Sequence, residues 1–221
     1  MNQTVSGASG PAGGKGGTNA IQVGLGSSLA SIDNIDTQGS AQTTNRTLDF
    51  SIEGDGYFVV KNGTESFYTR AGNFYLDEKG TLVTSEGFKV QNDTDPGTDI
   101  TIPADTVSFS IGQGGEITVV DANGTSRTLA TIGVAKFKNP AGLTKAGNNT
   151  FQESVNSGEP EIGMADTGGR GTLTSGRLEM SNVDLSEEFT EMIVAQRGFQ
   201  ANTRIITTSD EILQELVNLK R

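Results

Sequence analysis

The chain has 221 residues, with 16 lysines and arginines against 27 aspartates and glutamates and a formal net charge of −11. This acidic balance, without a basic cluster, argues against nucleic acids and anionic membranes as partners. The absence of cysteine, histidine and tryptophan excludes disulfides, Cys or His nucleophiles, Ser-His-Asp triads and thiolate or imidazole zinc sites. No apolar run approaches the roughly 20 residues that insertion into a membrane needs, and no cleavable leader is evident.

Residues 1–45 are predicted to form a flexible lead-in followed by an extended segment. Residues 1–18 are rich in glycine and serine and have no hydrophobic period, which is typical of a flexible stretch. Apolar residues then recur in two short extended pieces, the first of them a predicted strand. The first contains Ile21, Val23 and Leu25, and the second contains Leu29, Ile32 and Ile35.

Residues 46–138 are predicted to form a β domain. Alternating apolar runs are separated by turn signals about every 8 to 12 residues, which is typical of a sandwich or barrel-like domain. Two Asn-Gly pairs, at Asn62 and Asn123, predict tight hairpins. The predicted strands lie at residues 48–52, 57–60, 67–70, 74–76, 81–84, 88–91, near 100, and at 107–111, 117–120 and 129–137.

Residues 139–180 are predicted to form a return connection. They are rich in turn residues, including Pro140 and Pro160. Two short extended pieces, around Leu173 and Leu178, lead into the last segment.

Residues 181–221 predict one long amphipathic helix, with no proline and a single glycine, Gly198. Its apolar residues recur at alternating spacings of four and three. One heptad position holds Leu185, Met192, Phe199, Ile206 and Leu213. The adjoining heptad position holds Phe189, Gln196, Thr203, Asp210 and Val217, so the seam contains polar residues midway. A second stripe widens the apolar face toward the end and contains Ile205, Ile212, Leu216 and Leu219.

Both ends of this helix carry residues that are typical of helix termini. Asp184 and Glu187 form a variant of the capping box, and Glu188 adds negative charge to the first turn. Lys220 and Arg221 place positive charge at the other end. A helix of roughly 38 residues would be nearly 60 Å long at about 1.5 Å per residue, more than a domain of this size can cover. We therefore expect it to pack against helices from other molecules.

Candidate chemical sites are weak. Residues 93–97 only faintly resemble a calcium loop, because Gly97 stands where an EF-hand needs an oxygen ligand. The glycine clusters at 24–26 and 112–115 lack the following helix that a phosphate cradle needs. Some of the 27 acidic residues will lie near each other by chance, and there is no tryptophan to bind a sugar. We expect no enzymatic activity, no metal and no cofactor.

Three stretches resemble bacterial flagellar hook and rod proteins. The C-terminal SNVDLSEEFTEMIVAQRGFQANTRIITTSDEILQELVNLKR is similar to the C-terminus of hook proteins. DFSIEGDGYFVVKNGTESFYTRAGNFYLDEKGTLVTSEGFKVQ resembles the β-domain signature that hook and rod proteins share, and GTNAIQVGLGSSLASIDNIDTQGSAQTTNRTLDFSIEGDGYFVV resembles the stretch entering that domain. Within the family, DLSEEFTEMIVAQRGFQAN favours the hook over the distal rod.

The resemblance implies a mainly β protein with a compact β domain of the hook and rod type and a coiled-coil C-terminal α-helix. It implies a structural subunit of the hook, which self-assembles into a flexible tubular joint and transmits torque from rod to filament. The implied partners are further copies of the full-length chain, the rod, hook-cap and hook–filament junction proteins, and the flagellar export apparatus. Export would proceed without a cleaved signal peptide, to the extracellular flagellum. The ten heptad residues between 185 and 217 would then pack the helices, with Gln196, Thr203 and Asp210 setting the register.

The chain departs from the family pattern in three ways. Family members begin with an amphipathic helix that carries an Ala-Asn-x-x-Thr-x-Gly-type motif, which this sequence lacks, so we expect a shortened chain. Residues 91–100 leave little room for the outer domain of larger hook proteins, which predicts a compact subunit with one β domain. The absence of cysteine also excludes the covalent cross-link that some hook proteins form.

Two alternatives to the hook stay open at this point. The first is the distal rod protein of the flagellar basal body, a related but rigid drive-shaft segment. The second is a secreted β-rich binding module whose helix docks on a host protein, which would be a soluble monomer with a defined ligand. An enzyme is a more distant alternative.

Overall fold

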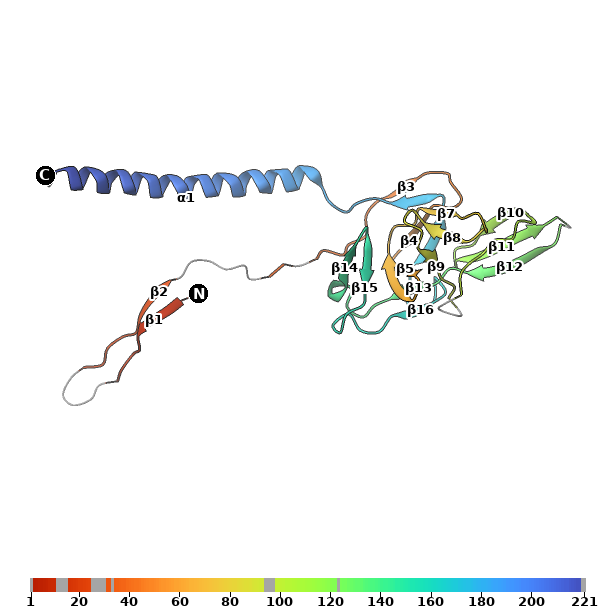
Figure 1. The fold of residues 1–221 in the computed structure, drawn as a ribbon, viewed down its shortest axis with the longest axis horizontal. Coiled ribbons are helices and arrows are strands. Elements are labelled where there is room, and N and C mark those ends of the chain that lie inside the picture. Colours follow the sequence, from red (N-terminus) through yellow and green to blue (C-terminus); the bar gives the residue numbers. More distant parts are fainter. Residues whose placement is uncertain are drawn as a thin grey trace. The chain divides into compact units, whose positions relative to one another are not determined.

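The structure is a computed structural model that describes residues 2–10, 16–24, 31–32, 34–93, 98–122 and 124–219. The chain divides into two units, Met1–Ile35 and Asp36–Arg221, and each is described by itself. Figure 1 follows the chain from one end to the other.

The first unit contains one antiparallel hairpin. Strand β1 (Asn2–Ser6) pairs with β2 (Ile21–Gly24), and an isolated bridge between Ser9 and Thr18 extends the pairing. Strand β2 agrees with the predicted strand, whose last residue, Leu25, lies outside the described residues, as does Leu29 of the second predicted piece. Strand β1 was not predicted, because its sequence NQTVS has one apolar residue and therefore no hydrophobic period.

The second unit is built around a nine-stranded antiparallel sheet (Figure 1). The hydrogen-bonded order is β14-β15-β6-β5-β9-β8-β7, and β13 pairs with β5 and β16 beside this path. The strands are β5 (Tyr57–Asn62), β6 (Glu65–Thr69), β7 (Phe74–Leu76), β8 (Leu82–Thr84), β9 (Lys89–Val90), β13 (Val134–Lys136), β14 (Thr144–Gly147), β15 (Thr150–Gln152) and β16 (Glu161–Gly163).

Strand β5 is buried on both of its faces. Because successive side chains of a strand point to opposite sides, Phe58 and Val60 join the larger core cluster, whereas Tyr57 and Val59 join a smaller one. The larger cluster also takes in Phe50, Phe74, Leu82, Ile117, Ile132 and Leu173. The compact β domain predicted from the alternating pattern is therefore confirmed.

The predicted Asn-Gly hairpin after β5 is present. Asn62 pairs with Glu65, and Gly63 has a φ of 63°, a left-handed conformation that glycine adopts without strain. Asn123 of the second predicted hairpin lies outside the described residues, but the strands on either side of it, β11 (Glu116–Asp121) and β12 (Ser126–Thr131), are paired. With β10 (Thr106–Ile111) they form a separate three-stranded sheet.

The predicted strand at 129–137 divides into β12 and β13. Between them, Gly133 donates a backbone hydrogen bond to Gln91 (3.0 Å) and accepts one from Val59 (3.3 Å). The chain thus passes from the three-stranded sheet to the nine-stranded sheet at this glycine.

The return connection contains three strands that the sequence analysis missed. Strands β14, β15 and β16 join the nine-stranded sheet, and a short 3-10 helix, η1 (Pro140–Gly142), precedes them. Between β14 and β15 the turn is made by Asn148 and Asn149, with φ of 50° and 57°. Asparagine tolerates this left-handed conformation better than most residues, but without glycine the hairpin signal was overlooked.

Two further strand pairs bring distant parts of the chain together. Strand β4 (Phe50–Glu53) pairs with β17 (Thr172–Ser175), and β3 (Ala41–Thr43) pairs with β18 (Arg177–Glu179). Strands β17 and β18 correspond to the two extended pieces predicted around Leu173 and Leu178. Strand β3 lies in residues that the sequence analysis placed with the lead-in.

One long helix, α1 (Leu185–Leu219), ends the described chain. Its 35 residues correspond to about 50 Å at 1.5 Å per residue. The prediction of a mainly β chain with a long C-terminal helix is therefore confirmed. Among the described residues, no helix is both long and apolar enough to cross a membrane.

An ion pair on the β domain makes a pH-dependent contribution to stability. Lys89 Nζ donates to Asp99 Oδ2 at 2.6 Å, and Gln91 Nε2 donates to Oδ1 at 3.0 Å. Burial by itself raises the pKa of Asp99, but the hydrogen bonds from Lys89 and Gln91 and the nearby lysine charges outweigh it, so the pKa lies below its usual value. A lowered pKa in the folded state means that the ionised carboxylate stabilises the fold.

We expect Asp99→Asn to lower the free energy of unfolding at pH 7 by less than about 1 kcal/mol, since the pair is partly exposed. The contribution is present above the unfolded-state pKa of about 3.9 and is lost as the pH falls through the lower folded-state pKa. Urea unfolding at pH 7 and at pH 2 measures this difference. Lys89→Met should show the same pH trend, and a loss for Asp99→Asn that is equal at both pH values would contradict the prediction.

Candidate assembly interface

Asp184 caps the first turn of α1, but through Ser186 rather than through Glu187, the partner that the predicted capping box would use. Asp184 Oδ1 accepts a hydrogen bond from the backbone N–H of Ser186 at 2.8 Å, and the Asp184 carbonyl accepts the first helical bond, from Glu188. Glu187 and Glu188 lie in the first turn, where the helix dipole favours negative charge. The predicted C-terminal charges, Lys220 and Arg221, lie outside the described residues.

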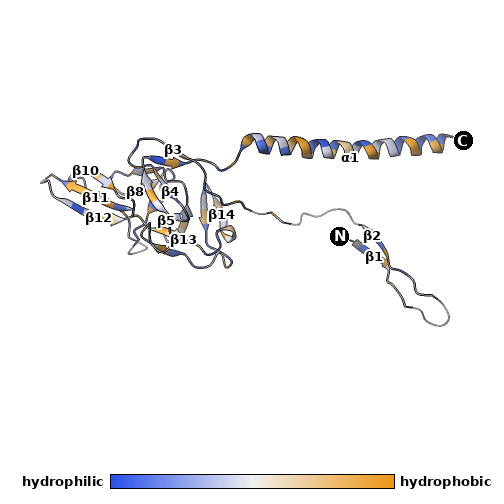
Figure 2. Cartoon of the chain, turned by 180° about the vertical axis from the view of Figure 1, so that it is seen from behind, coloured by the Kyte–Doolittle hydropathy of each residue, from blue (hydrophilic) through white to orange (hydrophobic). Residues whose placement is uncertain are grey.

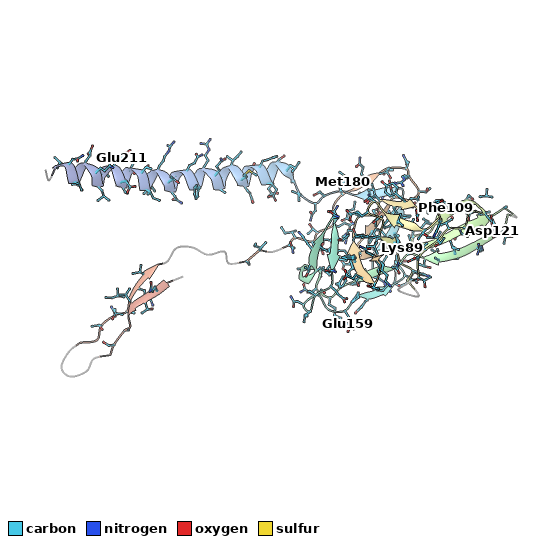
Figure 3. The ribbon with its side chains drawn as sticks, viewed as in Figure 1. Lys89, Phe109, Asp121, Glu159, Met180 and Glu211 are labelled. Atoms are coloured by element: carbon cyan, nitrogen blue, oxygen red, sulfur yellow. The ribbon has the colours of Figure 1, made fainter. Side chains whose placement is uncertain are left out.

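The apolar seam of α1 is exposed along its whole length. The seven apolar seam residues are between 57% and 77% exposed, and no described residue of the helix is buried. They are Leu185, Phe189, Met192, Phe199, Ile206, Leu213 and Val217. Figure 2 shows apolar and polar residues alternating along the ribbon, and Figure 3 shows the side chains standing around it, with Glu211 labelled. Within the described residues of the second unit, the seam therefore has no cover.

The C-terminal half of α1 is apolar over a wide arc. At about 100° per residue, the apolar residues of the seam and of the second stripe between Ile205 and Leu219 together span an arc of roughly 160°. The second-stripe residues are also 57% to 82% exposed. A single partner helix covers a narrower stripe than this, so complete burial of the arc requires more than one neighbour.

The polar seam residues differ in whether their hydrogen-bonding groups are still available to another molecule. The Thr203 hydroxyl donates to the carbonyl of Phe199, one turn earlier, at 2.9 Å. Similar bonds join Thr190 to Ser186 and Ser209 to Ile205. Because the Thr203 hydroxyl proton is already used within the helix, Gln196 and Asp210 are the stronger candidates for contacts with another molecule.

The arginines of α1 are not placed to form stabilising pairs with acidic residues along the helix. Arg197 and Arg204 have no acidic residue three or four positions away, and Glu187 with Glu191 forms a like-charged pair four residues apart. Within the described part of the chain, none of the ion pairs involves this helix. These groups are therefore available to partners.

The described residues show no group of three or more acidic side chains placed to hold a metal ion. Four residues of the calcium-like stretch predicted at 93–97 lie outside the described chain. An open groove near the start of α1 is lined by residues 37–40 and 181–185. Most of its lining residues are polar.

Comparison with known proteins identifies the family. The family described as "Flagellar hook protein FlgE/F/G D1 domain" matches residues 51–119, and "Flagellar basal body rod FlgEFG protein C-terminal" matches residues 174–219. The flagellar basal-body rod protein FlgG of Bacillus subtilis (strain 168) is 55% identical over 222 residues, covering 100% of this chain and 83% of the relative. The chain belongs to the flagellar hook and basal-body rod family. As a member of this family it is a flagellar structural subunit.

A rod protein and a hook protein from one organism differ in how similar they are to this chain. The basal-body rod protein FlgG of Borreliella burgdorferi is 40% identical, over 90% of this chain and 75% of the relative. The hook protein FlgE of the same organism is 28% identical, in an alignment of 397 positions that uses 100% of this chain and 90% of the relative. The hook prediction is therefore not confirmed, and the comparisons favour the rod alternative.

The reason for the hook prediction lies in the segment on which it rested. DLSEEFTEMIVAQRGFQAN falls mostly on α1, and the family description for residues 174–219 includes hook and rod members alike. The segment therefore does not separate the two kinds of subunit.

Proposed function

We propose that this chain is a structural subunit of the distal rod of the bacterial flagellar basal body and that it polymerises through α1. The observation that carries the proposal is the exposed apolar arc of this helix in a chain whose relatives are rod proteins. Full burial of one such side chain stabilises an assembly by about 1.5–3 kcal/mol. Several of them per subunit suffice for a stable polymer.

A tube of helices satisfies the geometry of α1. Each helix in a closed layer has neighbours on more than one side, which is what an apolar arc of roughly 160° requires. The ten seam residues predicted from the sequence form the core of this proposed contact. Gln196 and Asp210 set the register between neighbours, since a polar residue inside an apolar seam tolerates few alignments.

The proposed partners follow from this role. They are further copies of the chain and the neighbouring rod and hook components of the flagellum. Delivery by the flagellar export apparatus, without a cleaved signal peptide, completes the proposal.

The double variant Phe199→Ser, Leu213→Ser tests the helix contact. Its two side chains are 77% and 59% exposed, so we expect the β domain to fold normally while self-association falls by about tenfold or more, as the transfer free energy of two large apolar groups predicts. Analytical ultracentrifugation over a range of concentrations, with electron microscopy of the sedimented material, measures this.

Val155→Ser is the matched control, because Val155 is an exposed apolar residue of the β domain and should leave association unchanged. A wild-type chain that stays monomeric at the highest concentration would contradict polymerisation through α1. Straight polymers support the rod, whereas curved and flexible ones would favour the hook.

A further inference from the structure

Hydrogen bonds link three segments of the second unit around Arg70, whose own side chain bonds the second and the third of them. The first is residues 36–43, which lead into the β domain. The second is residues 177–182, which lead out of it toward α1. The third is the β domain itself, in which Arg70 follows the last residue of β6. Its side chain is 20% exposed, so it is largely withdrawn from water.

Glu179 links the outgoing segment to the other two. Its Oε2 accepts a hydrogen bond from Arg70 Nε at 3.0 Å, and its Oε1 accepts one from the backbone N–H of Gly39, also at 3.0 Å. The carboxylate is 11% exposed. Both oxygens therefore face donors, and the negative charge is compensated by a buried guanidinium.

The remaining nitrogens of Arg70 hold the turn between β4 and β5. Nη1 donates to the carbonyl of Gly56 at 3.3 Å, and Nη2 donates to that of Gly54 at 3.1 Å. The incoming segment reaches the same region through Gln38. Its amide nitrogen donates to the Ile52 carbonyl at 3.0 Å, and its amide oxygen accepts from the Gly54 N–H at 3.1 Å.

The incoming and outgoing segments also contact each other directly. The backbone N–H of Met180 donates to the Ser40 carbonyl at 2.8 Å, and the Asn182 amide donates to the Thr37 carbonyl at 3.0 Å. The approach is close enough that a Cβ on Gly39 would lie 1.9 Å from the Met180 carbonyl oxygen. Figure 3 labels Met180 in this outgoing stretch.

A second contact fixes the start of the incoming segment. The Tyr57 hydroxyl donates to Asp36 Oδ2. Burial, together with this hydrogen bond, raises the pKa of Tyr57 above its ordinary value, so the hydroxyl stays protonated and remains a donor. Tyr57 also lies under the Arg70 guanidinium, 5.9 Å from ring centroid to Cζ.

We propose that Arg70 is a positioning residue that clamps both connecting segments onto the β domain, so that residues 177–182 at the base of α1 move with the domain as one body. The guanidinium bonds the outgoing segment through Glu179 and the β4–β5 turn through Gly54 and Gly56, while Arg177 of the outgoing segment pairs with Glu53 at the end of β4 at 3.3 Å. The clamp transmits force between helix and domain through directional polar bonds rather than through the apolar core. Because all of these contacts lie within one chain, the clamp is expected in either polymer, rod or hook.

Native-state hydrogen exchange on the full chain tests the clamp. In Arg70→Met the amides of Gly39 and Met180 should exchange about tenfold faster or more, because the segments that hold them open locally. The amide of Gln91, bonded to the Val59 carbonyl in the core, should keep its wild-type rate. Glu179→Gln should show the same pattern, since its NH₂ group would face one of the two donors that the carboxylate now accepts from.

Arg127→Met is the control, because it removes an ion pair with Asp121 in the three-stranded sheet and should change neither marker amide. Arg70→Lys keeps the charge but loses the planar guanidinium with its fixed N–H donors. In this variant the Gly39 and Met180 amides should exchange more slowly than in Arg70→Met but faster than in the wild type. Equal acceleration at Gly39, Met180 and Gln91 would mean general destabilisation and would overturn the clamp. Unchanged rates at Gly39 and Met180 in Glu179→Gln would overturn it as well, even if Arg70→Met fails to fold.

Discussion

Replacing Phe58 with alanine is expected to lower the free energy of unfolding by about 3–5 kcal/mol, the usual cost of removing a fully buried phenylalanine. Phe58 is 0% exposed at the centre of β5. Its ring meets that of Phe74 edge to face, with centroids 5.1 Å apart and planes at 85°. The variant loses both the buried area and this aromatic contact. Urea unfolding followed by circular dichroism in the β region measures the change.

Phe199→Ala is the control, because it makes the same substitution at an exposed position. Because Phe199 is 77% exposed, its removal should change the stability of the β domain by no more than about 0.5 kcal/mol. If Phe58→Ala costs no more than this control, the centre of the core does not lie on β5.

Replacing Gly80 with alanine is expected to cost about 2–5 kcal/mol. Gly80 closes the turn between β7 and β8 with a φ of +79°, and an added Cβ would lie 2.1 Å from the carbonyl oxygen of Ile102. The left-handed backbone accounts for about 1–2 kcal/mol, and the displacement of Ile102 for about 1–3 kcal/mol. Thermal or urea unfolding of the variant gives the total.

Gly63→Ala separates these two contributions. Gly63 has a φ of +63°, but a Cβ there would meet no atom within 4 Å, so only the backbone cost of about 1–2 kcal/mol applies. The clash at Gly80 is disproved if the two variants lose equal stability.

The elements that the sequence predicts are those set by local pattern. The continuous apolar run at residues 57–60 and the heptad spacing along residues 185–217 are visible within a short window, and both elements are present. The strands that were missed, β1, β3 and β14 to β16, are short, and β1, β3 and β14 have no buried residue among those whose burial is described. The pairing of these three depends on backbone hydrogen bonds, which every sequence can offer, so no hydrophobic signal marks them. Strands β15 and β16 each place one apolar residue, Phe151 and Ile162, against the smaller core cluster, which is too few to make a period.

Functional residues could likewise be predicted where one element holds them, but not where the fold brings distant residues together. The ten seam residues could be identified because one helix places them on one face, and their exposure agrees with a role in packing between molecules. Arg70 and Glu179 could not be paired in advance, since they are 109 residues apart and no local pattern connects them. The preference for hook over rod failed for a different reason, because it rested on a helix pattern that both subunits share.

The paired strands at the boundary of the β domain have a wider consequence. Because β3 lies beside β18 and β4 beside β17, everything between residues 54 and 171 is an excursion that starts and finishes at one place. This segment can be lengthened or replaced while the pairs β3–β18 and β4–β17 are kept. The hook relative from Borreliella burgdorferi aligns with all of this chain over 397 positions, so at least 176 of those positions (397 minus 221) have no counterpart here. Grafting a foreign domain onto the β4–β17 pair would give a decorated subunit with its helix unaltered.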